Sequence, residues 1–122
     1  MSATSRIRVA RVYDHPGPAD GQRILVDRLW PRGFRKDDPR VGTWLKDVAP
    51  STELRDWYGH KPERFEEFAA RYKTELAHNE ARKRALEDLR ELARHGPVTL
   101  VTATRDIDGS QAAVLAQVLK GR

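Results

Sequence analysis

The segment Val98–Ala103 constrains the fold more than any other part of the chain. It reads VTLVTA, and such a run of apolar and β-branched residues is typical of a strand buried on both faces. A long stretch with helical periodicity precedes it, between about residues 62 and 95, and a second strand-like segment, Ile24–Leu29, precedes that stretch. Two strands separated by helices predict an α/β fold in which both strands run in the same direction.

Two further segments before the helical stretch have recognisable patterns. Ile7–Tyr13 alternates β-branched and charged residues and predicts a strand. The loop His15–Gly21 is too short to contain a crossover helix, so we expect this connection to join antiparallel neighbours. A short helix is expected around Val41–Val48.

The remaining helices are predicted from their apolar stripes and their capping residues. Ser51 or Thr52 caps a short helix that Gly59 closes. The long stretch breaks near residues 78–79 and is either one bent helix or a helical pair. A final helix over 111–119 is capped by Asp108 or Ser110.

The 122 residues suit one small domain over 1–122, with residues 1–5 as a flexible tail. We expect a short, mostly parallel sheet of three to four strands with helices packed around it.

Composition narrows the classes of function. The 23 basic residues exceed the 18 acidic ones, for a net charge of +5, so anionic partners fit. The chain has no cysteine, which excludes thiolate nucleophiles, disulfides and cysteine zinc sites. Histidine and acidic residues lack metal-ligand spacing, so we expect no metal and no cofactor. No apolar run is long enough for a signal peptide or a membrane span, which predicts a cytoplasmic protein that does not bind membranes.

The candidate site lies where the two parallel strands end, because ligands of open α/β sheets bind beyond the carboxyl ends of the strands. We predict an anion-binding pocket in which arginines donate to phosphate or carboxylate and Asp27 positions Arg28. His60 is the candidate proton carrier if the protein is an enzyme, although its position also suits an ordinary loop histidine. The predicted ligand-binding residues are Asp27, Arg28, Arg32, Gly33, Ser51, Arg55 and Arg105.

Other interpretations remain open. Asp27 and Arg28 can form a simple ion pair at the end of the sheet, with Arg32 in solvent. A nucleic-acid or transcription-regulator-associated module without catalytic activity is the alternative function, and a partner-binding scaffold is a third. The sequence leaves open whether the protein is an enzyme and whether it is a monomer or a homodimer.

The chain carries four motifs in this order: LVDRLWPRG at 25–33, WLKDVAPSTELRDWYGH at 44–60, FEEFAARYKTEL at 65–76 and VTLVTATRD at 98–106. With these motifs it resembles the YeaO-like branch of domain-of-unknown-function family 488 (DUF488). The resemblance implies a small, cytosolic α/β protein of bacteria or archaea without an established biochemical role. A wider branch of that family carries cysteines at the strand end and before the final helix. Here those places read Thr102-Ala103 and Ser110-Gln111-Ala112, so the resemblance implies no thiol chemistry.

Overall fold

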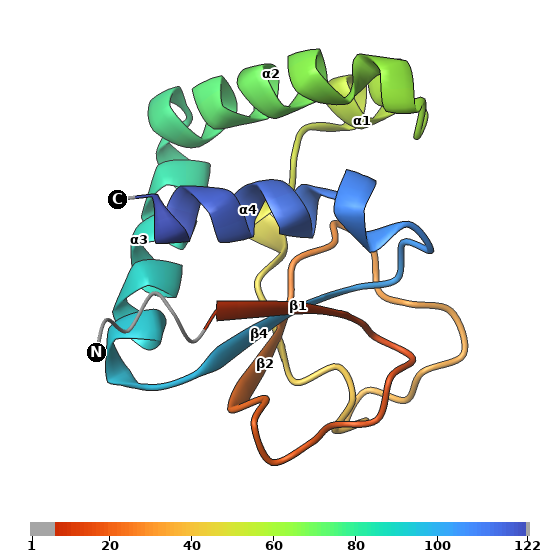
Figure 1. The fold of residues 1–122 in the computed structure, drawn as a ribbon, viewed down its shortest axis with the longest axis vertical. Coiled ribbons are helices and arrows are strands. Elements are labelled where there is room, and N and C mark those ends of the chain that lie inside the picture. The colour runs from red at the N-terminus through yellow and green to blue at the C-terminus, as the bar shows by residue number, and fades with distance from the viewer. Residues whose placement is uncertain (1–6, 122) are drawn as a thin grey trace.

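The computed structural model describes residues 7–121 and contains a four-stranded sheet with helices on one side of it (Figure 1). The predicted tail over residues 1–5 lies outside the described residues. The strands are β1 (Ile7–Arg11), β2 (Gln22–Leu25), β3 (Thr43–Trp44) and β4 (Val98–Thr102). The helices are α1 (Thr52–Tyr58), α2 (Phe65–His78), α3 (Glu80–His95) and α4 (Gln111–Lys120). The predicted α/β class is confirmed.

All strand pairs in the sheet are parallel, and their order is β1-β4-β2-β3. The central strand β4 pairs with β1 on one side and with β2 on the other, so that Leu100 stands opposite both Val9 and Ile24. This confirms that β2 and β4 are co-directional. It also shows that the expected antiparallel pairing of the first two strands is wrong, because β4 lies between them.

The first connection explains that difference. Residues 12–21 separate β1 from β2, and an extended chain of that length spans about 33 Å at 3.3 Å per residue. A strand of five residues is about 17 Å long. The loop is therefore long enough to return along the sheet and begin β2 in the direction of β1 without a helix.

Two segments differ locally from the sequence prediction. The expected helix at 41–48 is instead the edge strand β3 followed by the 3-10 turn Lys46–Val48. Gly42 adopts φ +72° just before β3, and the amide of Leu45 donates to the carbonyl of Leu25 at 2.9 Å. Pairing with β2 thus overrides the helical pattern. The second strand also ends at Leu25, four residues before its predicted end.

The helical boundaries follow local capping signals. Ser51 caps α1, and Gly59 closes it in the left-handed region at φ 54°. The long helical stretch is a pair, because the side chain of Asn79 accepts from the amide of Arg82 and starts α3. Ser110 rather than Asp108 caps α4.

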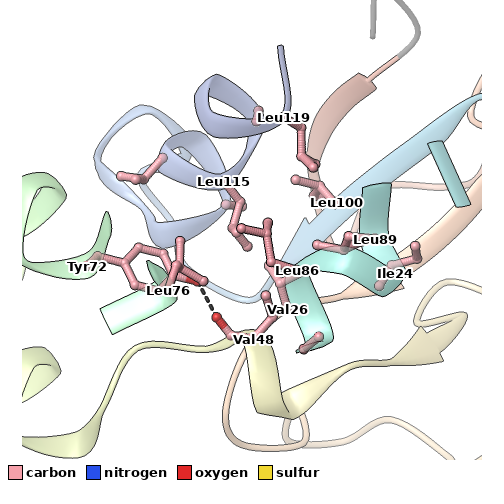
Figure 2. Close-up of a cluster of buried hydrophobic side chains, with 14 of the residues drawn as sticks. Ile24, Val26, Val48, Tyr72, Leu76, Leu86, Leu89, Leu100, Leu115 and Leu119 are labelled. Atoms are coloured by element: carbon pink, nitrogen blue, oxygen red, sulfur yellow. Dashed lines mark hydrogen bonds between the residues drawn. The ribbon is translucent and has the colours of Figure 1, made fainter. Parts of the chain in front are cut away.

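The core occupies both faces of the sheet. One face packs against the helices through Ile24, Val26 and Leu100, which contact side chains of α2, α3 and α4 (Figure 2). The other face carries a smaller cluster formed by Val12, Leu25, Val41 and Val101, which the loops after β1 and β2 cover. Every residue of β4 is buried, as the apolar run predicted.

Candidate functional site

A cavity of about 620 Å³ opens at the carboxyl ends of β2 and β4. Its walls come from the loop after β2 at 27–32, the end of α1 at 55–60, the turn after β4 at 103–104, and Gln111 at the start of α4. Tyr13 and Phe68 complete the lining. Segments distant in sequence therefore meet at the edge of the sheet where parallel strands place their ligands.

Two tryptophans hold the loop that follows β2. The indole of Trp44 donates to the carbonyl of Asp27 at 2.8 Å, and the indole of Trp30 donates to the carbonyl of Phe34 at 2.9 Å. The two indole rings meet edge to face with their centroids 5.4 Å apart. These contacts fix the backbone from which Asp27 and its neighbours reach the cavity.

Asp27 is the most highly connected polar group of the cavity. Its carboxylate accepts hydrogen bonds from the Thr102 hydroxyl at 2.7 Å, the Ala103 amide at 2.8 Å and the Gln111 amide group at 2.5 Å. Burial raises the pKa of Asp27, while these hydrogen bonds and the charge of Arg55 lower it, and the net direction is upward. Asp27 therefore joins the loop after β2 to the end of β4 and to α4 in the cavity lining.

The expected role of Asp27 in positioning Arg28 is wrong. Within residues 7–121, the hydrogen bonds and ion pairs of the Asp27 carboxylate do not include Arg28. The alternative of a simple Asp27–Arg28 ion pair fails for the same reason. The donors that Asp27 uses come from β4 and α4, which folding alone brings next to the end of β2.

Three arginines line the cavity with unused donors. Arg28 and Arg32 come from the loop after β2, and Arg55 comes from α1; all three are exposed. Over the described part of the chain, none of their guanidinium groups bonds to another protein group. Each retains its full set of N–H donors for a ligand.

His60 and Tyr58 form the side of the cavity next to α1. His60 has φ 57°, a left-handed conformation that is uncommon for a residue other than glycine, and its ring centroid lies 5.8 Å from that of Tyr58. The Tyr58 hydroxyl donates to the carbonyl of Gly109 at 2.7 Å, and burial together with the charge of Asp106 raises the pKa of Tyr58. This contact ties α1 to the turn before α4.

Three predicted site residues do not line the cavity. Gly33 forms a turn at φ 85°, and Arg105 is exposed on the loop after β4. The Ser51 hydroxyl accepts from the Leu54 amide at 3.2 Å and donates to Glu75 at 2.5 Å, so it serves the cap of α1. Of the four predicted arginines, Arg28, Arg32 and Arg55 thus line the cavity, and Arg105 does not.

Sequence reasoning missed Gln111 and Thr102 as partners of Asp27. Gln111 follows the N-cap of the final helix directly, and that position was the available signal, since first-turn residues of α4 face the ends of the strands. Within residues 7–121, histidine and acidic side chains form no cluster of three or more that suits a metal ion. In the same range, no helix combines the length and the apolar character needed to cross a membrane.

Comparison with known proteins decides the family. A family model described as the inactive DUF488-N3 subclade matches residues 6–122. The chain belongs to this family. No solved structure matches it.

The chain is similar to the uncharacterized protein Rv3073c of Mycobacterium tuberculosis, with 62% identity over 122 residues and full coverage of both chains. The uncharacterized protein Mb3100c of Mycobacterium bovis has the same identity and coverage. The uncharacterized protein YeaO of Escherichia coli is 40% identical over 114 residues, which are 93% of this chain and 96% of YeaO. The resemblance drawn from the four motifs is confirmed, and the names of these relatives assign no activity.

Proposed function

We propose that the protein binds a small molecule with a phosphate or carboxylate group in the cavity at the carboxyl ends of β2 and β4. The observation that carries the proposal is the presence of three cavity-lining guanidinium groups, from Arg28, Arg32 and Arg55, without protein partners in the described chain. Guanidinium groups present planar forks of donors that match the oxygens of phosphate and carboxylate. Arg23, by contrast, is already paired with Asp20 at 2.7 Å.

The charge balance of the cavity supports an anion. Three arginines face two acidic side chains of the lining, Asp27 and Asp56. Asp27 already accepts three hydrogen bonds from the protein, which offset part of its negative charge. The rim therefore offers more positive than negative charge to an entering ligand.

Binding without catalysis fits the family best. Its model carries the description "inactive", so we propose no catalytic step for the present chain. His60 lines the cavity and is available for hydrogen bonding to a ligand without any proton transfer.

Calorimetric titration with inorganic phosphate and with citrate tests the proposal. We expect Arg28→Ala, Arg32→Ala and Arg55→Ala each to weaken binding by about tenfold or more, because a hydrogen bond to a charged group contributes about 1.5–3 kcal/mol. Arg105→Ala and Arg84→Ala remove exposed arginines outside the cavity and serve as matched controls. Equal affinity in all six proteins, or no binding to the wild type, would refute the site.

The same variants separate this function from nucleic-acid binding. A gel-shift series with a single-stranded oligonucleotide across ionic strength measures the salt dependence that phosphate-backbone binding requires. We expect no oligonucleotide binding near physiological salt. Binding that weakens steeply with salt and is reduced equally by Arg84→Ala and Arg28→Ala would instead indicate a diffuse basic surface.

A further inference from the structure

The hydrogen-bonding capacity of Asp27 is not used up by the protein. An ionised carboxylate has about four acceptor positions, two on each oxygen. Oδ1 of Asp27 accepts from Thr102 at 2.7 Å and from Gln111 at 2.5 Å, whereas Oδ2 accepts, among residues 7–121, from the Ala103 amide alone at 2.8 Å. Asp27 also lines the cavity, so the remaining position on Oδ2 is available to a ligand.

A hydrogen-bond donor on the ligand can occupy this free acceptor position. A half-buried carboxylate repels an anionic group but gains from a hydroxyl or ammonium group that replaces water. The anionic end of a bound molecule is attracted instead to the exposed arginines of the lining, Arg28, Arg32 and Arg55. The arginines and Asp27 thus select two different chemical groups.

Apolar side chains also form part of the cavity walls. Leu29, Trp30, Pro31 and Phe68 line the cavity together with the polar groups, and a volume of about 620 Å³ lies within the usual range for small-molecule sites. Such walls suit a short carbon skeleton. They make the cavity a site for one molecule with two functional groups rather than for a bare ion.

We infer that the ligand is a small phosphate or carboxylate compound that also carries a hydroxyl or ammonium group, with the anionic end on the arginines and the donor on Oδ2 of Asp27. The inference rests on the proposed anion site and specifies its substrate class. Asp27 acts in it as the residue that determines specificity.

Three phosphate monoesters of similar length provide the test: propyl phosphate, glycerol 1-phosphate and 3-aminopropyl phosphate. In the wild type we expect at least one of the two donor-bearing esters to bind about tenfold more tightly than propyl phosphate, as one added hydrogen bond to a carboxylate predicts. In Asp27→Asn this preference should fall to within about twofold, because an amide is a weaker acceptor than a carboxylate. Asp37→Asn, an exposed acid outside the cavity, should keep the wild-type preference.

A measurement on the wild type avoids reliance on the fold of the variant. Glycerol 1-phosphate or 3-aminopropyl phosphate should shift the carboxyl ¹³C resonance of Asp27 in NMR spectra, and propyl phosphate should shift it much less. Binding of all three esters with equal affinity, sensitive to Arg28→Ala, would overturn the specificity while leaving the anion site intact. A failure of all three esters to bind would overturn both.

Discussion

The substitution Tyr72→Phe tests how much one buried hydrogen bond in the core contributes to the stability of the protein. Tyr72 is completely buried, and its hydroxyl donates to the carbonyl of Val48, in the 3-10 turn that leads into α1 (Figure 2). Burial raises the pKa of Tyr72 well above its usual range, so the phenol stays a donor at neutral pH. Tyr72→Phe keeps the ring packing but leaves a buried carbonyl without this partner.

The magnitude follows from that loss. An unsatisfied buried polar group costs about 1–3 kcal/mol, so we expect Tyr72→Phe to lower the free energy of unfolding by about 2 kcal/mol. With an unfolding entropy of about 2.1 cal/mol/K per residue, the whole chain has about 0.26 kcal/mol/K, and Tm should fall by about 8 °C.

Urea unfolding and thermal melts followed by circular dichroism measure this change. Tyr13→Phe is the matched control, because Tyr13 is 42% exposed and its hydroxyl makes no hydrogen bond within the described residues. Its stability should stay within about 0.5 kcal/mol of the wild type. If the two variants lose the same stability, the reasoning about the Tyr72–Val48 hydrogen bond is refuted.

Three further predictions concern a loop carboxylate, a turn and a helix cap. Hydrogen bonds from the side chain and amide of Arg40 lower the pKa of Asp38 to about 2, so NMR titration should show a midpoint there. Because the folded pKa lies below the ordinary 3.8, the stabilisation is complete above that value and is lost as pH falls toward 2. Gly42→Ala should cost more than about 1 kcal/mol in urea unfolding, since φ is +72° and a Cβ would lie 2.1 Å from the carbonyl oxygen of Arg23. Ser110→Ala should cost about 1 kcal/mol in the same assay, because it removes the side-chain cap of α4.

Each of these predictions has a control. Arg40→Ala should return the midpoint of Asp38 toward 3.8, and a midpoint that stays near 2 contradicts the assigned cause. Gly33→Ala meets a positive φ of +85° but no atom within 4 Å, so it should cost less than Gly42→Ala. Ser110→Thr keeps the hydroxyl and should retain most of the capping energy, and a loss equal to that of Ser110→Ala argues against the cap.

Elements with strong local signals were predictable from the sequence. The α1 helix begins after Ser51 and ends at Gly59, as its capping residues indicate, and β4 is buried on both faces, as its apolar run indicates. The strand β3 was not predictable. Its two residues are held by pairing with β2, and this long-range contact leaves no periodic pattern in so short a segment.

Part of the cavity also followed from the sequence. Asp27, Arg28 and Arg32 were expected beyond the end of a strand, and Arg55 and His60 at the rim, and the structure places all five in the lining. The partners of Asp27 were not foreseen. Its donors Thr102 and Gln111 lie 75 and 84 residues away along the chain, so only the folded chain brings them together.

Periodicity, capping residues and runs of β-branched side chains act within a few residues, and they were enough to specify the helices, the buried central strand and the α/β class. The insertion of β4 between β1 and β2, and the position of Arg105 outside the cavity, depend on how complete elements pack. Packing of that kind is governed by the burial of whole faces and by hydrogen bonds between distant segments. Both depend on residues that are far apart in the sequence, so no local sequence pattern predicts them.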